Sequence, residues 1–119
     1  MYPIPKDVDW SFMVGKDLIQ VCYGQYQTQL RFLSDVSISI EANVEHCDGS
    51  QVLSRSQDRE QGVASLIALL GASIDHVELE GEIALALHFS NGNVLRLLVD
   101  DAPYEAFSIS APGEMTIVV

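Results

Sequence analysis

Two histidines and one glutamate in the second half of the chain have side chains that readily bind transition metals. His76 and Glu78 alternate along one predicted strand, and His88 lies on the next strand. The predicted pairing sets His76 opposite Ala86, which makes His88 its diagonal neighbour at roughly 7–8 Å between backbones. Two imidazoles and a carboxylate form a ligand set for divalent metals, so these three residues are a candidate metal site. Surface histidines that bind nothing are the competing interpretation.

Carboxylates dominate the same half of the chain. From Glu60 onward there are nine acidic residues and one basic residue, Arg96. An acidic face of this kind attracts a basic protein and raises its association rate. A solvated surface that only keeps the protein soluble is the alternative. The candidate partner-binding residues are Glu78, Glu80, Glu82, Asp100, Asp101 and Glu105.

Other reactive side chains give weaker signals. The chain has no Walker loop, GxGxxG, GxSxG, HExxH or paired CxxC motif, which favours a protein that is not an enzyme. The run His46-Cys47-Asp48 cannot easily converge on one ion if it is a strand, because adjacent strand residues point to opposite faces, and a polar turn is the preferred interpretation. Cys22 has no basic partner placed near it, so an unreactive thiol is expected. No cofactor is predicted.

Short strands separated by turn residues must position these groups. Runs rich in β-branched and aromatic residues predict two three-stranded antiparallel meanders and a C-terminal hairpin. The first meander covers residues 15–44, the second covers 71–99, and the hairpin covers 104–119. Residues 51–57 are predicted to be a mobile segment.

The two meanders share a sequence pattern. Aligning Gly15 with Gly71 places Leu18 on Ile74, and the match continues after one inserted residue. Internal duplication and the alternation common to any two meanders are both compatible with this pattern. The inserted residue lies in the first turn of the second meander, because the register of each hairpin is fixed by the residues that must share its buried face.

The buried faces also predict the loop lengths. The first hairpin is expected to turn through two residues, 24–25, and the second through three, 80–82, which pairs Val77 with Leu85. For the third hairpin a three-residue loop, 91–93, pairs Leu87 with Leu97. Alternatively, the last strand of the second meander is central and covered on both faces.

One amphipathic helix is predicted between the meanders, over residues 58–70. Asp58 is suited to cap its N-terminus, apolar residues follow at helical spacing, and Gly71 ends it. The apolar stripe consists of Val63, Leu66, Ile67 and Leu70. The predicted fold class is therefore α+β, with about eight mostly antiparallel strands and one helix in a single domain, 1–119.

Overall charge limits the possible partners. The 119 residues include 17 acidic and 6 basic side chains, for a formal net charge of -11. Nucleic acids and anionic membranes need a basic surface, so neither is an expected partner. The N-terminus lacks the basic and apolar regions of a secretory signal, and no run of 18 apolar residues occurs, so a cytoplasmic location is expected.

Several motifs together resemble a known family. They are Phe89-Ser90-Asn91-Gly92 and the tail Tyr104-Glu105-Ala106-Phe107-Ser108-Ile109. The chain resembles a family of small, acidic bacterial proteins of unknown function that have a Y-E-S-Y-x-I-like tail motif. Ala106 and Phe107 stand where that motif usually has Ser and Tyr. The resemblance implies no activity, and the chain is also similar in general character to toxin-immunity proteins.

The leading hypothesis is a non-enzymatic bacterial binding domain that docks a basic protein through its acidic face. A toxin-immunity or antagonist role is its sharpest version. A small metal-dependent hydrolase that uses His76, Glu78 and His88 is an alternative from the enzyme class. A self-assembling domain is the third hypothesis, because a free meander edge can pair across a two-fold axis into a homodimer.

Overall fold

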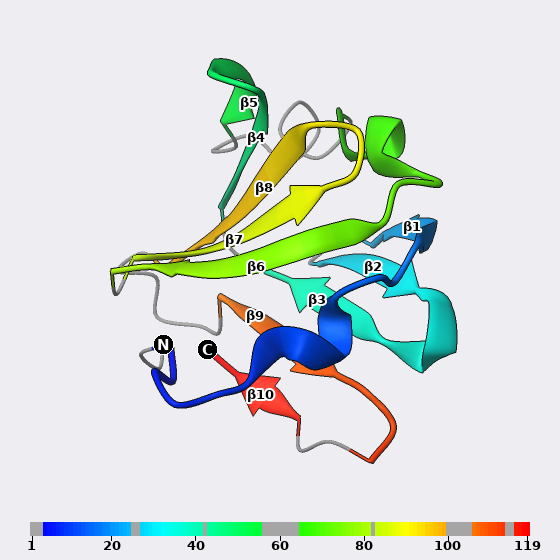
Figure 1. Ribbon diagram of the computed structural model, residues 1–119, viewed down its shortest axis with the longest axis vertical. Coiled ribbons are helices and arrows are strands. Elements are labelled where there is room, and N and C mark those ends of the chain that lie inside the picture. The colour runs from blue at the N-terminus through cyan, green and yellow to red at the C-terminus, as the bar shows by residue number, and fades with distance from the viewer. Residues whose placement is uncertain are drawn as a thin grey trace.

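The computed structural model describes residues 4–24, 27–41, 43–55, 65–81, 83–99, 106–113 and 116–119. Its described residues form ten strands in two five-stranded antiparallel sheets (Figure 1). In order across the first sheet the strands are β1 (Leu18–Tyr23), β2 (Thr28–Phe32), β3 (Ser37–Ile40), β9 (Phe107–Ser110) and β10 (Ile117–Val118). Across the second they are β5 (Gln51–Arg55), β4 (Val44–Asp48), β8 (Asn93–Leu98), β7 (Ala84–Phe89) and β6 (Ile74–Glu80).

Helical structure in the described residues is limited to three short 3-10 segments, so the fold is mostly β and the predicted α+β class is wrong. The segments are η1 (Trp10–Met13), η2 (Leu33–Asp35) and η3 (Ser65–Leu69). The N-terminal part of the predicted helix 58–70, residues 58–64, lies outside the described residues.

The described part of that predicted helix follows a three-residue period. Leu66 and Leu69 are fully buried, whereas Ile67 and Leu70, which were expected on the buried stripe, are 54% and 44% exposed. The backbone N–H of Leu70 donates to the carbonyl oxygen of Ile67 at 3.1 Å, which is the i to i−3 bond of a 3-10 helix. The predicted stripe had the i, i+3, i+4, i+7 spacing of an α-helix, whereas the buried residues Leu66 and Leu69 are three residues apart, as in a 3-10 helix.

The two meanders are structurally equivalent and meet around a local two-fold relation. The N–H of Gly15 donates to the carbonyl oxygen of Ile74 at 2.7 Å, and the N–H of Gly71 donates to that of Leu18 at 2.9 Å. Each bond maps onto the other when the aligned halves are exchanged. Both glycines have a positive φ, +82° and +87°, which side chains other than glycine adopt only with strain.

The hairpins that follow the meanders cross over between the sheets. Strands β4 and β5 follow the first meander in the chain but pair beside β8 in the second sheet. Strands β9 and β10 follow the second meander but pair beside β3 in the first sheet. Residues 51–57 were predicted to be a mobile segment; 51–55 form β5, and 56–57 lie outside the described residues.

Both turns of the second meander differ from prediction by two residues in register. Val77 pairs with Leu87 instead of Leu85, and Leu87 pairs with Leu95 instead of Leu97. The first hairpin differs in the same way, because Tyr23 pairs with Thr28. A shift of two residues keeps every side chain on its predicted face, since strand side chains alternate with a period of two. It changes only which residues are neighbours.

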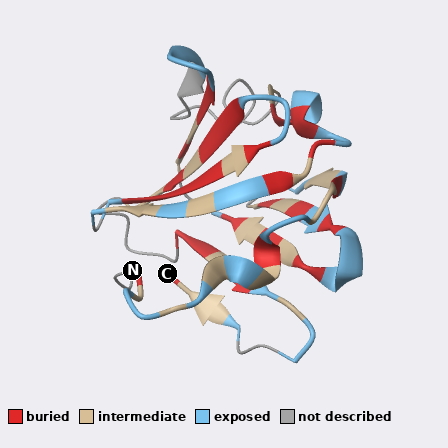
Figure 2. Ribbon diagram, in the orientation of Figure 1, coloured by how far each residue is buried: buried red, intermediate tan, exposed pale blue. Residues whose placement is uncertain are grey.

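The inner faces of the two sheets share one core, to which β2, β3 and β9 contribute from one side and β4, β7 and β8 from the other. Figure 2 shows the buried colour concentrated on the central strands of both sheets. Phe32 and Phe89, which are aligned positions in the two meanders, stack with their ring centroids 6.5 Å apart. No helix in the described residues is long and apolar enough to cross a membrane.

Candidate functional site

The outer face of the second sheet gathers the ionisable residues of four strands. The register places Glu78, Ala86, Arg96 and Glu45 in one cross-strand row. His76, His88, Val94 and Cys47 form the next row. Residues directly opposite each other in a sheet share a face. We call the side chains of Glu45, Cys47, His76, Glu78, Glu80, His88 and Arg96 the ionisable face.

A small apolar cluster lies beneath these polar side chains. Cys47, Ala86 and Val94 are buried and contact one another apart from the main core. Arg96, from the central strand β8, is only 27% exposed although it points away from the main core. Strand β8 is thus covered on both faces, which explains its almost continuous apolar sequence.

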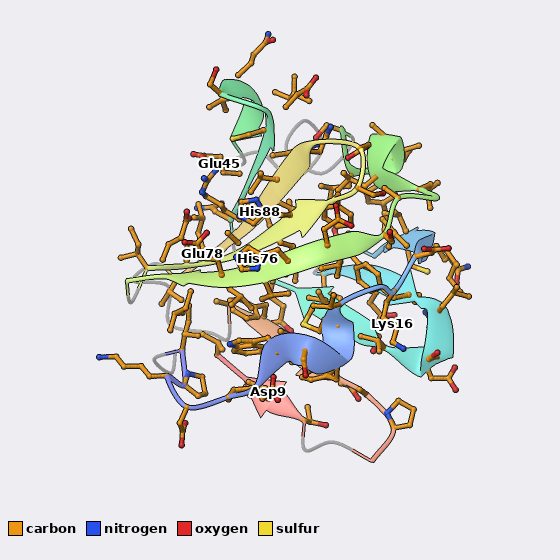
Figure 3. All side chains as sticks on the ribbon, viewed as in Figure 1. Asp9, Lys16, Glu45, His76, Glu78 and His88 are labelled. Atoms are coloured by element: carbon orange, nitrogen blue, oxygen red, sulfur yellow. The ribbon has the colours of Figure 1, made fainter. Side chains whose placement is uncertain are left out.

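His76 and His88 face each other directly across β6 and β7 rather than diagonally. Their ring centroids are 5.3 Å apart. The Oε2 atom of Glu78 lies 3.5 Å from Nε2 of His88 and 3.9 Å from Nε2 of His76. Figure 3 shows these three side chains close to one another over strands β6 and β7. The two-residue register shift is the reason they are closer than the sequence predicted.

The Nε2 atom of His88 is buried and lacks a hydrogen-bond partner among the described residues. Its 3.5 Å separation from the Glu78 carboxylate lies beyond the usual range of an N–H···O hydrogen bond. Ligand geometry is not closed either, because no group of three or more His, Cys, Asp or Glu side chains in the described ranges is arranged to hold a metal ion. The three residues are therefore neighbours without being bonded into a finished site.

Arg96 neutralises part of the acidic charge on this face. Its Nε donates to Oε1 of Glu80 at 2.6 Å, and a second guanidinium nitrogen donates to Oε2 at 3.4 Å. A third nitrogen donates to Oε1 of Glu45 and to Sγ of Cys47, both at 3.4 Å. The hydrogen bond that Arg96 donates to Glu80 is the main cause of the raised pKa of Arg96. Burial is the main cause of the raised pKa of the Cys47 thiol.

The predicted partner-binding residues are placed only in part. Glu78 is exposed on β6, with 53% of its side chain accessible, whereas Glu80 is 32% exposed and paired with Arg96. The other four predicted residues, Glu82, Asp100, Asp101 and Glu105, lie outside the described residues. Asp75, which was counted among the acids but not chosen as a site residue, is also exposed on β6.

A buried hydrogen-bond network on the opposite face of β4 escaped prediction. His46 is fully buried, with its Nδ1 2.9 Å from Oγ of Ser65 and its Nε2 2.6 Å from Oδ1 of Asn93. Since an amide oxygen only accepts, Nε2 carries the proton and Nδ1 accepts from the serine hydroxyl. The network ties η3 to strands β4 and β8.

The expected polar turn at His46-Cys47-Asp48 is wrong, because these residues belong to strand β4. His46 and Cys47 do lie on opposite faces of the strand, as expected for adjacent strand residues. The phase of the buried Val44 two residues earlier would have placed His46 in the core.

Comparison with known proteins identifies a family without an assigned activity. No curated protein and no solved structure matches the chain. The sequence pattern of one family, described as a family of unknown function (DUF6188), matches residues 12–119. This match covers both meanders and both crossing hairpins. The chain therefore belongs to the DUF6188 family of unknown function.

Proposed function

We propose that this protein is a non-enzymatic binding domain that docks a basic protein through strand β6 and the adjoining ionisable face. The main support is the placement of Asp75 and Glu78, two exposed carboxylates on a strand at the edge of its sheet. A toxin-immunity or antagonist role in the cytoplasm is the sharpest version of this proposal. The family match adds no activity of its own.

Strand β6 suits this role because it combines charge with accessibility. It is the last strand of the second sheet, so its outer edge faces away from β7. The chain's net charge of -11 gives long-range attraction for a basic surface. Glu78 has no Arg or Lys partner among the described ion pairs, whereas Glu80 already has one in Arg96. Glu78 is therefore the better candidate of the two for contact with a partner.

The test is a binding titration against any basic protein that is found to be encoded beside this one. Affinity should fall with added salt, and Glu78→Lys or Asp75→Lys should weaken binding, mainly through slower association. Asp7→Lys is the matched control, because it makes the same charge change at an exposed N-terminal position. Glu80 is left intact, since its replacement would break the ion pair with Arg96.

Two results would overturn the docking proposal. One is binding that does not respond to salt. The other is an equal loss of affinity in Asp7→Lys and Glu78→Lys, which would assign the effect to net charge rather than to this face. Failure to bind the neighbouring gene product would remove the toxin-immunity version.

A further inference from the structure

We propose that His76, His88 and Glu78 bind a divalent transition metal such as Zn²⁺ on the outer face of the second sheet. Metal binding goes beyond the proposed docking function, because it requires no partner protein. It rests on the convergence of two imidazoles and one carboxylate from adjacent strands, and on a buried imidazole nitrogen that has no partner.

The separation of the Glu78 carboxylate from each imidazole is close to the spacing that two ligands of a tetrahedral ion require. Ligands at 2.0–2.1 Å from Zn²⁺ are about 3.3 Å from each other in a tetrahedral site. The Glu78 Oε2 atom is 3.5 Å from Nε2 of His88 and 3.9 Å from Nε2 of His76. A change of a few tenths of an ångström is needed, mostly at His76, whose side chain is 62% exposed and so has room to rotate. Without that movement, no group of three or more His, Cys, Asp or Glu side chains among the described residues is arranged to hold a metal ion.

The buried nitrogen of His88 is the observation that points most directly to a ligand. Its Nε2 is inaccessible to solvent and accepts or donates no hydrogen bond among the described residues. A buried polar atom without a partner is unfavourable. Coordination would satisfy it, since a neutral imidazole offers a lone pair to a metal.

The fold itself does not require a histidine pair at this position. In the first meander Gln20 and Arg31 occupy the equivalent places and pair in the same way next to an equivalent bulge. The backbone thus forms the same hairpin without imidazoles. The histidine pair of the second meander is therefore a difference in side chains between two hairpins that have the same backbone pairing.

The ligand types define the metal class. Imidazole suits Zn²⁺, Cu²⁺ and Ni²⁺, whereas Mg²⁺ and Ca²⁺ prefer all-oxygen sites. Three protein ligands leave one position of a tetrahedral ion for water. Arg96, a cationic group on the same face, donates to Glu80 at 2.6 Å, and its charge is thereby partly balanced.

The experiment is calorimetric titration of metal-free protein with Zn²⁺, repeated with Mg²⁺. We expect one Zn²⁺ per chain and no binding of Mg²⁺. Since loss of a mere supporting contact costs 10–100-fold in metal affinity, His76→Gln, His88→Gln and Glu78→Gln should each weaken Zn²⁺ binding by at least about tenfold. Asp75→Asn, a neighbouring exposed carboxylate on β6, is the matched control and should bind as the wild type does.

Thermal unfolding gives a second readout and a check on folding. Zn²⁺ should raise the Tm of the wild type and of Asp75→Asn, but not that of His76→Gln/His88→Gln. Lack of Zn²⁺ binding by the wild type, or undiminished binding by folded His88→Gln, would overturn the proposal. His76→Gln also separates the two proposals, because it removes a metal ligand but leaves both docking carboxylates in place.

Discussion

The buried His46 network makes a sharp prediction about stability. In His46→Leu, a side chain of similar size replaces the imidazole, so the cavity term is small. The hydrogen bonds of 2.9 Å to Ser65 and 2.6 Å to Asn93 are lost. Asn93 is only 8% exposed, so its amide oxygen gains little contact with water in compensation.

The expected cost follows from these contacts. Each of the two lost hydrogen bonds contributes about 1 kcal/mol, and a buried polar group left without a partner costs about 1–3 kcal/mol, so the free energy of unfolding should fall by about 3–5 kcal/mol. That is a large share of the roughly 5–15 kcal/mol typical of a domain. Urea denaturation would measure it as a lower midpoint at unchanged slope.

A double-mutant cycle tests the reasoning directly. Asn93→Leu should itself be destabilising, because it leaves His46 Nε2 without an acceptor. His46→Leu/Asn93→Leu removes both partners and should cost less than the sum of the single changes. Strict additivity, or a loss below about 1 kcal/mol for His46→Leu, would refute the account. The exposed His76→Leu should change stability by less than about 0.5 kcal/mol.

Two further predictions concern the ionisable face. Burial raises the pKa of the Cys47 thiol above its ordinary 9.0, so the folded state holds the thiol proton more tightly than the unfolded state does. The stability that this proton contributes is fully present below the ordinary pKa and should be lost as the pH rises through the raised pKa. Urea unfolding at increasing pH should therefore show a smaller decline in stability for Cys47→Ala than for the wild type. Glu80→Gln removes the 2.6 Å charged hydrogen bond to Arg96 and should cost about 1 kcal/mol at low salt, with a smaller loss at high salt; equal losses at both salt concentrations would contradict an electrostatic origin.

Within the two meanders, sequence patterning predicted which face a strand residue occupies, but not its exact neighbour. Alternation predicts His76 and His88 on the outer face for any register that differs by two residues. Only the turn geometry distinguishes a diagonal pair from a direct one, and the turn sequences were compatible with both. The candidate metal residues were therefore identifiable from the sequence, while their 5.3 Å ring separation was not.

The helix failed for a different reason. The prediction rested on Leu66, Ile67 and Leu70 at α-helical spacing, but the 3-10 segment buries Leu66 and leaves Ile67 and Leu70 exposed. It buries Leu69 in their place. The crossing of β4 and β5 into the second sheet was also beyond prediction, because local patterns do not say which sheet a hairpin joins. His46 was assigned to a polar turn because the turn signal Asp48-Gly49 follows it, although it is buried and contacts Ser65 and Asn93.

The repeated frame separates what the fold needs from what a function can use. Aligned inward positions in the two meanders are alike in type, as in Phe32 with Phe89 and Ile38 with Leu95. Aligned outward positions differ, and the first sheet has serines where the second has Arg96 and Glu45. Since the main core lies on the inner face and the outer face packs only the small cluster of Cys47, Ala86 and Val94, the charged and imidazole groups of the second sheet are not explained by folding alone. Substitutions there should consequently affect binding more than stability, except at Glu80 and Arg96, whose ion pair covers the small outer cluster.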